Sequence, residues 1–410
     1  MTYDIVIIGG GAAGIATAAS ILKRNAKVSI AVVDAARDHY YQPGWTLVGA
    51  GVFTPEQTRK AEADVMPKGV EWIRLPAITI DPERQAITLG DGDTIAYRVL
   101  IVAPGLRLAW EKIAGLTEAL GRNGVTSNYR YDLAPYTYQL VQELQRGRAL
   151  FSQPPMPIKC AGAPQKAMYL SCDIWRERGV LPAIDVEFHN AGAALFGVAT
   201  YVPALMEYVE KYRINLKLES NLVAVDADRR IATFERKQNG VSERIERGFD
   251  MLHVVPPQVS HDVVAKSSLA AANGFVEVDE ATLRHKRYDN VFALGDAAGT
   301  SNAKTAAAAR KQAPVVAVNA LAALEGKPPV VDYDGYGSCP LTVERGKIVL
   351  AEFGYGGKLL PSFPSWLLNG TRPTRAAWFL KERMLPPIYW QGMLKGHEWM
   401  AAPHKIGKAA

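Results

Sequence analysis

Two of the three cysteines stand where a thiol would be chemically reactive. Cys160 comes just before a predicted helix, with Lys159 and Lys166 nearby, and a helix N-terminus and neighbouring cations both lower a thiol pKa. Cys339 follows two closely spaced glycines and precedes Pro340, a pattern that indicates a loop. Neither cysteine lies in a periodic apolar segment. These residues therefore favour thiolate formation and thiol–disulfide exchange.

The third cysteine has the opposite setting. Met168, Cys172 and Trp175 recur at i, i+4 and i+7 on one face of the predicted helix, which is typical of a core. We therefore expect Cys172 to be a small buried hydrophobe. Three cysteines cannot form a disulfide framework, and no metal site is predicted.

A glycine-rich turn near the N-terminus indicates a dinucleotide. The segment YDIVIIGGGAAGIATAASIL predicts a buried strand, a turn and a helix, with Gly9, Gly11 and Gly14 in G-x-G-x-x-G spacing. The amides of Gly11, Ala12 and Ala13 would point at a pyrophosphate from the helix N-terminus. A second strand ends at Asp34, twenty residues after Gly14, where a ribose hydroxyl would be bound.

Further strands end in small residues, as in a large flavoprotein. The segment Tyr97–Gly105 is a hydrophobic strand that closes on a turn, and a second such strand places Asp296 at its carboxyl end. There the carboxylate would accept a hydroxyl of the ribityl chain. A predicted helix follows, and its first amides would direct a positive dipole end at the pyrimidine edge of a reduced flavin; they belong to Lys304, Thr305, Ala306 and Ala307.

These elements match an α/β architecture with tandem Rossmann-like domains, that of the two-dinucleotide-binding-domain flavoproteins. An FAD domain in two pieces, residues 1–110 and 280–330, would flank a second domain at 111–279 that carries Cys160, and residues 331–410 would form a C-terminal region with Cys339. The length of 410 residues agrees with two or three domains. The composition, 48% hydrophobic and 21% charged, excludes a disordered or fibrous protein.

The second domain lacks the features that would bind a nicotinamide dinucleotide. Its turn is proline-rich with one glycine, Gly162, and cannot form a G-x-G-x-x-G cradle. The next strand ends at His189 and Asn190 and not at an acid. Both absences argue against NAD(P)H as the reductant.

The C-terminal segment concentrates the positive charge. The net charge is +6, and residues 360–410 carry seven Lys and Arg against two acids, together with half of the eight tryptophans. Two short helices are predicted, Thr374–Leu385 and Ile388–Trp399, separated by two prolines. Basic residues among Trp, Tyr and Met favour an anionic membrane surface. An oligomer interface remains the alternative, and nucleic acid binding is not expected.

Each predicted helix offers one face to this membrane. The first would place Arg375, Lys381 and Arg383 beside lipid headgroups, and the second would bring forward Tyr389, Trp390, Met393 and Leu394. At about twelve residues each, roughly 18 Å, the helices are too short to span a bilayer. No run of 18 apolar residues occurs, and because the chain opens with a strand we expect no secretory or transit peptide.

Several segments together resemble sulfide:quinone oxidoreductases, in the subgroup that includes the mitochondrial enzymes. They are HYYQPGWTLVGAG, IKCAGAPQKAMYLS, MLHVVPP, SNAKTAAAA, DGYGSCPLT and IVLAEF, and the likeness covers nearly the whole chain. The resemblance implies FAD, a quinone site, peripheral membrane attachment and a redox pair at Cys160 and Cys339. It implies flavin contacts at Gly9, Gly11, Ala12, Ala13, Gly14, Asp34, Gln42, Ala77, Gly105, Asp296, Lys304, Thr305, Ala306 and Ala307.

One departure from the family concerns how the flavin is held. Many bacterial members carry a further cysteine before the Cys160 position, and some attach the flavin through it. No cysteine occurs between Gly105 and Ile158 here. We therefore expect FAD to be bound non-covalently.

The resemblance implies that hydrosulfide opens a Cys160–Cys339 bridge, with a persulfide on Cys339 and a thiolate on Cys160, and that two electrons pass through FAD to membrane quinone. The sulfur would leave as polysulfide or on an acceptor such as a small thiol or sulfite. His253 is either a proton carrier or a structural histidine. A bacterial inner membrane is the expected location, and a homo-oligomer is left open. The alternatives are a flavin-dependent NADH:quinone reductase of the same fold and a non-enzymatic membrane-associated flavoprotein.

Overall fold

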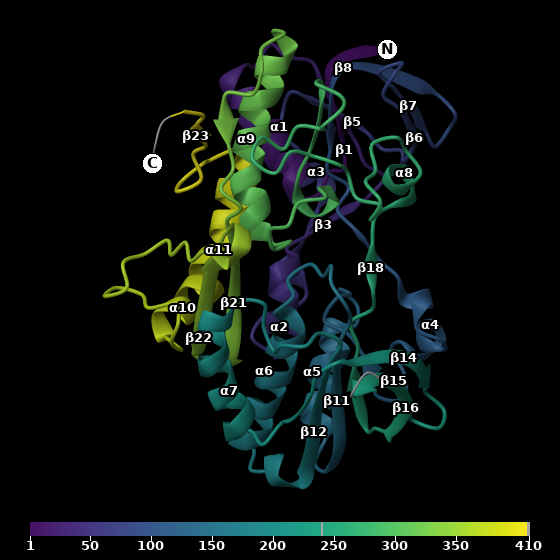
Figure 1. The fold of residues 1–410 in the computed structure, drawn as a ribbon, viewed down its shortest axis with the longest axis vertical. Coiled ribbons are helices and arrows are strands. Elements are labelled where there is room, and N and C mark those ends of the chain that lie inside the picture. The colour runs from purple at the N-terminus through teal and green to yellow at the C-terminus, as the bar shows by residue number, and fades with distance from the viewer. Residues whose placement is uncertain (239–240, 408–410) are drawn as a thin grey trace.

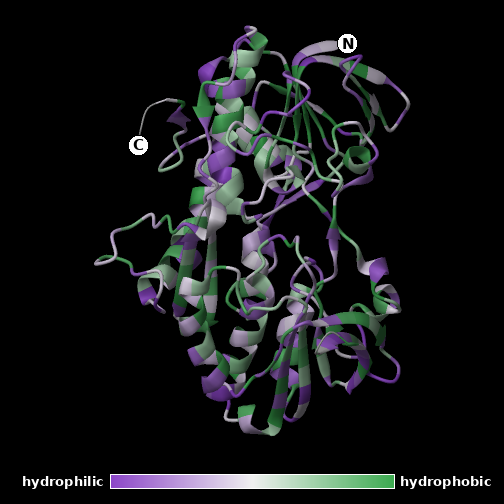
Figure 2. Cartoon of the chain, in the orientation of Figure 1, coloured by the Kyte–Doolittle hydropathy of each residue, from purple (hydrophilic) through white to green (hydrophobic). Residues whose placement is uncertain are grey.

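The computed structural model describes residues 1–238 and 241–407. The upper half of the molecule in Figure 1 is built on a seven-stranded sheet of order β5-β2-β1-β8-β7-β6, with β19 also paired to β8. The strands are β1 (Thr2–Ile8), β2 (Ile30–Val33), β5 (Val70–Ile73), β6 (Ala77–Asp81), β7 (Ala86–Leu89), β8 (Thr94–Val102) and β19 (Val291–Ala293). Strands β1, β2, β5, β8 and β19 run parallel. The apolar residues of β1, β2, β8 and β19 are buried, whereas those of β5 at the sheet edge are half-buried. Figure 2 shows hydrophobic residues along these strands.

Two helices lie side by side against this sheet (Figure 1). They are α1 (Ala12–Arg24), which begins at the glycine turn, and α9 (Ala306–Leu324). Helix α9 begins later than predicted: its first helical residue is Ala306 and not Lys304. Thr305 is the N-cap, and its hydroxyl accepts from the Ala308 amide. Lys304 and Thr305 therefore precede the helix, because a capping threonine ends the extended segment one residue before the first helical amide.

The lower half contains a second parallel sheet, of order β10-β17-β11-β12-β13. Its strands are β10 (Val125–Thr126), β11 (Gly147–Gln153), β12 (Ile184–Asn190), β13 (Asn215–Lys217) and β17 (Met251–His253). The helices α5 (Ala134–Glu143), α6 (Ala163–Glu177) and α7 (Val202–Lys211) pack with it, and β14 (Ser220–Asp226), β15 (Ile231–Gln238) and β16 (Val241–Gly248) form a separate antiparallel sheet.

Cys339 lies in a strand, and the predicted loop is wrong. It belongs to β21 (Gly337–Glu344), which pairs antiparallel with β22 (Lys347–Phe353). Cys339, Leu341 and Val343 alternate along β21 and are all buried against α6. The hairpin is two-stranded, so Pro340 can occupy it although it has no N–H to donate.

The C-terminal helical segment is continuous, where two helices were predicted. It runs through α10 (Arg375–Phe379), a π-helical turn (Leu380–Met384), α11 (Leu385–Pro387) and a second π-helical turn (Ile388–Gly392). The two prolines keep helical backbone angles, and the wider π-helical turns accommodate their missing N–H groups.

The second predicted membrane face is also wrong. Its four apolar residues, Tyr389, Trp390, Met393 and Leu394, are buried in the core shared with α1. The residues that follow this segment are also held by the rest of the protein, because β23 (His404–Lys405) pairs with β20 (Val331–Asp332). Within residues 1–238 and 241–407, no helix is both long and apolar enough to span a bilayer.

Candidate active site

Cys160 lies in a strained turn that several backbone contacts hold in place. Its φ of +50° is in the left-handed region, which non-glycine residues seldom adopt. The Cys160 amide donates to the Lys304 carbonyl at 2.7 Å, and the Tyr129 hydroxyl donates to the Lys159 and Cys160 carbonyls at 3.0 and 3.1 Å. These bonds fix the thiol between α6 and the segment that leads into α9.

The structure brings Cys160 and Cys339 together from distant parts of the chain. Both are free thiols, and Cys160 packs against the core cluster that contains Cys339, so that each side chain shifts the pKa of the other. Gly162 permits this approach: a Cβ atom at this position would lie 2.6 Å from Cys339 Sγ. The sequence shows this glycine only as the remnant of a lost nucleotide fingerprint, and its role becomes visible only with the fold.

Lys166 extends into this pair from the first turn of α6. Its Nζ lies 3.2 Å from Cys160 Sγ, and the side chain is buried. The two sulfurs raise the pKa of Lys166 and so hold it charged. Lys159, the other lysine predicted beside Cys160, instead points to Gln42, with Nζ 2.5 Å from Oε1.

The predicted lipid contact of Lys381 is wrong. This side chain is 4% exposed, and its charge acts on Cys160 and Cys339. Burial, reinforced by Lys166, lowers its pKa to about 7. The helical spacing contained one signal: Lys381 lies four residues after Ala377, which is fully buried on the same face.

These groups shift the pKa values of the two thiols in opposite directions. The neighbouring thiol of Cys339 chiefly lowers the pKa of Cys160, and Lys166 and Lys381 lower it further against the effect of burial. Cys160 and burial raise the pKa of Cys339. Cys160 is therefore the thiol of lower pKa and the more readily ionised member of the pair. Cys172 is fully buried, and burial raises its pKa, as expected for a core residue.

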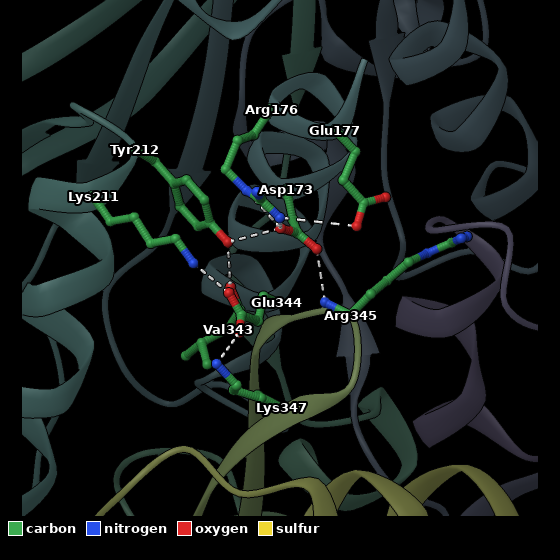
Figure 3. A network of polar contacts seen from close by, with 9 residues as sticks. All are labelled: Asp173, Arg176, Glu177, Lys211, Tyr212, Val343, Glu344, Arg345 and Lys347. Atoms are coloured by element: carbon green, nitrogen blue, oxygen red, sulfur yellow. Dashed lines mark hydrogen bonds and ion pairs between the residues drawn. The ribbon is translucent and has the colours of Figure 1, made fainter. Parts of the chain in front are cut away.

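A polar network at the far end of α6 holds this helix against β21 (Figure 3). The Asp173 carboxylate accepts from the Arg345 amide at 2.8 Å and from the Tyr212 hydroxyl at 3.2 Å. Tyr212 also bonds the Val343 carbonyl, while Lys211 and Lys347 pair with Glu344. The network thus fixes the relative positions of the two elements that carry Lys166 and Cys339.

The glycine turn has the shape of a pyrophosphate cradle. A side chain on Gly9 would collide with the Ala103 carbonyl, and one on Gly14 with the Gly9 carbonyl. A Cβ on Gly11 would meet nothing within 4 Å, so the turn is open where a phosphate approaches. Asp34 accepts from the Gly10 amide at 2.5 Å and from the Ala36 amide at 2.7 Å, which fixes its carboxylate at the end of β2.

The predicted contacts at the other end of the cofactor also fit a flavin. The half-buried Asp296 carboxylate makes no hydrogen bond within the described ranges, and burial raises its pKa. A ribityl hydroxyl would satisfy it. The Lys304 ammonium is buried and donates to the Asp296 and Ala298 carbonyls, so this side chain stabilises the turn that carries Asp296.

The remaining predicted contacts lie around the same sheet. Gly105, with a φ of +76°, follows β8 and has open space around its Cα. Gln42 precedes α2 (Trp45–Val48), and Ala77 begins β6 at the sheet edge. Ala306 and Ala307 provide the first amides of α9, and Ala12 and Ala13 those of α1.

His253 has a structural role. Its Nε2 accepts from the Asn128 amide at 2.9 Å, and its ring stacks on Phe151. Burial lowers its pKa to about 3, so it remains neutral at physiological pH. The structure thus favours the second of the two interpretations of this residue.

At the end of β12, where the sequence lacks the acid of a dinucleotide site, the polar side chains bond to nearby groups of the chain. His189 bonds Glu187 and Ser220, and Asn190 bonds the Gly192 amide and the Ala194 carbonyl. The following loop is anchored to α6 by Gln165, which donates to the Leu195 carbonyl. Leu195 itself is buried in the core beside α6.

Comparison with known proteins agrees with the fold and the site. Residues 3–153 match the family described as pyridine nucleotide-disulphide oxidoreductase. The chain is 41% identical over 395 residues to the mitochondrial sulfide:quinone oxidoreductase of Dictyostelium discoideum, a match that covers 96% of this chain and 86% of the relative. It is 36% identical over 396 residues to the Mus musculus enzyme of the same name, covering 96% and 87%.

A solved structure shows the same fold. The sulfide:quinone oxidoreductase of the bacterium Aquifex aeolicus superposes with a TM-score of 0.80 at 19% identity, covering 98% of this chain and 96% of that chain. Fold and site therefore define an FAD-binding oxidoreductase of Rossmann-type α/β architecture. Within this class, the chain belongs to the sulfide:quinone oxidoreductase family. The prediction of a bacterial inner membrane finds no support here, since both of these relatives are named mitochondrial.

Proposed function

We propose that this protein oxidises hydrogen sulfide at the Cys160–Cys339 pair and passes two electrons through FAD to a quinone. One observation supports this most directly: two cysteines from separate elements meet beside two buried lysines. The family relationship supplies the substrate and the acceptor.

The sulfur chemistry follows from the unequal thiols. Hydrosulfide attacks Cys339 Sγ of the oxidised bridge, the S–S bond breaks, and Cys160 leaves as a thiolate while Cys339 keeps the incoming sulfur as a persulfide. This direction is favoured because the thiol of lower pKa is the better leaving group. Lys166 and Lys381 stabilise the negative charge that appears on Cys160.

This assignment keeps the persulfide on Cys339, as the resemblance implies. A loop position would expose this sulfur to solvent, but Cys339 is buried in β21. The difference in thiol pKa now supports the same direction of cleavage. The persulfide sulfur then passes to an acceptor such as a small thiol or sulfite, or leaves as polysulfide.

FAD supplies two-electron transfer from the sulfur pair to the quinone. Toward this cofactor we assign Gly9, Gly11 and Gly14 to the approach of the pyrophosphate and Asp34 to the ribose hydroxyl. The Ala12, Ala13, Ala306 and Ala307 amides would stabilise negative charge at the two helix ends. Asp296 would hold the ribityl chain, with Lys304 and Thr305 shaping the turn that presents it.

We further propose that the C-terminal region contacts a membrane, through a smaller surface than predicted. Trp366 and Leu367 are 84% and 57% exposed, and Phe379 and Met384 project from the outer side of the helical segment. Exposed basic residues, Arg372, Arg375 and Arg383, lie on the same stretch of chain. Aromatic and aliphatic side chains among cations fit the interface of an anionic bilayer.

The domain limits are proposed on the same basis. Strands of one sheet come from residues 2–102 and 291–293, which supports an FAD domain at 1–110 and 280–330. The second parallel sheet supports a domain at 111–279. The region 331–410 has only a small core of its own, around Ile348, Leu350, Leu368 and Ala377. It also packs on both domains, because Cys339 packs with α6 and Trp390 with α1.

An anaerobic flavin titration tests the proposed function. Sulfide should bleach the flavin of the holoenzyme, and an added short-chain quinone should restore the colour. NADH should leave the spectrum unchanged, since the second domain lacks both the glycine fingerprint and the acid of a dinucleotide site. Bleaching by NADH and not by sulfide would instead support an NADH:quinone reductase, and no response to either reductant would support a protein without turnover.

A further inference from the structure

The end of the chain is built into the FAD domain through the helix that begins at the dinucleotide turn. The Ser20 hydroxyl on α1 donates to Glu398 Oε1 at 2.7 Å, and Arg24 pairs with the same carboxylate at 2.6 Å. Gly396 lies so close to α1 that a Cβ at this position would be 2.9 Å from the Ala19 carbonyl oxygen. This contact is made by a tight turn and not by a loosely resting tail.

A second link between the C-terminal segment and the FAD domain runs through buried polar groups. The Tyr389 hydroxyl lies 2.6 Å from His39 Nε2, and His39 Nδ1 lies 3.2 Å from Glu62 Oε2. The three residues are 5%, 3% and 1% exposed. His39 lies on β3 (Asp38–Tyr40), which comes shortly after Asp34 in the chain. Glu62 directly follows β4 (Arg59–Ala61), the strand that pairs with β3. Tyr389 is thus joined to the segment that carries the ribose-binding acid.

Glu62, the last residue of this hydrogen-bonded chain, lies against the dinucleotide turn. A Cβ built on Gly10 would lie 2.8 Å from Glu62 Oε1 and 3.2 Å from Asp34 Oδ2. Glu62 Oε1 is buried and has no hydrogen-bond partner within residues 1–238 and 241–407. The Gly10 amide donates to Asp34 on the same side. Two carboxylates therefore enclose Gly10, one held by the turn and the other held by His39 and Tyr389.

We propose that Tyr389, His39 and Glu62 are positioning residues for FAD: together they form a buttress that holds the Gly10–Asp34 turn in its binding conformation. Formation of the Tyr389–His39–Glu62 contacts and binding of FAD then favour each other, because each requires the same arrangement of the turn, and such linkage is reciprocal. The inference rests on FAD binding by this turn and is independent of the sulfide reaction.

Release of FAD from the holoenzyme tests the buttress. Tyr389→Phe removes the hydroxyl that reaches His39 and keeps the packed ring. Dissociation is followed by the rise of free flavin fluorescence after dilution, with circular dichroism to verify the fold. Loss of one buried hydrogen bond should accelerate release or weaken the equilibrium affinity about fivefold.

Ser20→Ala is the matched control, because it removes another buried hydroxyl contact between the FAD domain and the C-terminal segment without touching Gly10 or Asp34. It should change FAD release less than twofold, roughly the spread expected between near-neutral variants. Equal effects of the two variants would overturn the buttress in favour of general docking, and so would no effect of Tyr389→Phe.

Hydrogen exchange of the two holoenzymes gives a second, local measurement. Peptides that cover residues 9–14 should exchange faster in Tyr389→Phe than in the wild-type protein, while in Ser20→Ala they should match the wild type. Unchanged exchange at the turn in Tyr389→Phe would likewise overturn the proposal. Neither measurement depends on sulfide or quinone, so the proposed function can fail without affecting this result.

Discussion

Gly162 and Cys339 are neighbours only because position 162 has no side chain. A Cβ atom there would lie 2.6 Å from Cys339 Sγ, well inside van der Waals contact, and would also collide with Leu341. Gly162 precedes α6, while Leu341 and Cys339 share one face of β21. The missing side chain at position 162 therefore lets β21 lie against the turn that carries Cys160.

Gly162→Ala should separate the cysteine pair while preserving FAD binding. The added methyl group must displace β21 or the turn before α6, and a misplacement of about 1 Å can slow a reaction on the order of 100-fold. The measurement is the stopped-flow rate of flavin bleaching by sulfide. Gly197→Ala is the control, because a Cβ there meets nothing within 4 Å. A wild-type rate in Gly162→Ala would show that the pair tolerates the displacement.

Replacing the cysteines should separate reactive from structural thiols. Cys160→Ser and Cys339→Ser should each retain FAD and lose sulfide-to-quinone turnover, since neither can form the bridge. Cys172→Ser should keep most of the turnover but unfold more readily, because a hydroxyl buried in the core costs about 1–3 kcal/mol. Steady-state quinone reduction and thermal unfolding check these outcomes. Full activity of Cys339→Ser would refute the exchange mechanism.

Lys381→Met should make the Cys160 thiolate harder to form, because the positive charge of Lys381 lowers the pKa of Cys160. Since the pKa of Lys381 is about 7, its charge is present below this pH and is lost above it. Alkylation of Cys160 in the reduced protein should therefore be several-fold slower in the variant below pH 7 and converge with the wild type above it. Peptide mass spectrometry measures the rate.

The exposed residue Arg383 provides the control for Lys381. Arg383→Met removes a cation from the same helical segment, but this side chain is 68% exposed and should leave the alkylation profile unchanged. An identical pH profile for Lys381→Met and the wild-type protein would contradict the placement of Lys381 in the site.

FAD should be released by acid without a covalent remnant. Precipitation with trichloroacetic acid should leave the yellow colour in the supernatant, because no cysteine lies between Gly105 and Ile158. Asp34→Ala should weaken FAD binding about 10–100-fold, the range for losing hydrogen bonds to a charged group. The rate of flavin bleaching in the loaded variant should change little. Colour in the pellet would demonstrate a covalent flavin.

Vesicle binding should depend on the exposed apolar residues of the C-terminal region. Replacing Trp366 and Leu367 together by Ser should reduce co-sedimentation with anionic vesicles at least about tenfold, since burying one such side chain contributes about 1.5–3 kcal/mol. Met156→Ser removes an exposed apolar residue from another part of the chain and should have no effect. Unchanged vesicle binding in the double variant would favour an oligomer interface at this surface.

The sequence predicted the parts of the fold that depend on local chemistry. The spacing of Gly9, Gly11 and Gly14 and the position of Asp34 define a strand–turn–helix–strand unit, because each glycine meets a steric demand inside that unit. The missing nucleotide fingerprint after β11 was equally local. Both features needed no knowledge of the rest of the chain.

The C-terminal region was harder to predict because lipid and protein core select the same side chains. Tyr389 and Trp390 would suit a bilayer interface, yet they pack on α1. Lys381 was predicted to bind a headgroup, because its spacing from Ala377 indicates burial but not that the fold brings Cys160 of the second domain and Cys339 of β21 near it. Strand β21 was missed for a related reason: glycine and Pro340 obscure its alternation, which becomes meaningful only against α6.

The end of β12 has a consequence for the source of electrons. Where a dinucleotide site would need an acid, this chain places His189 and Asn190, which bond to neighbouring groups. On the proposed function, the cysteine pair would then be the one donor to the flavin. Turnover would depend on the supply of sulfide and of oxidised quinone, and not on the ratio of NADH to NAD.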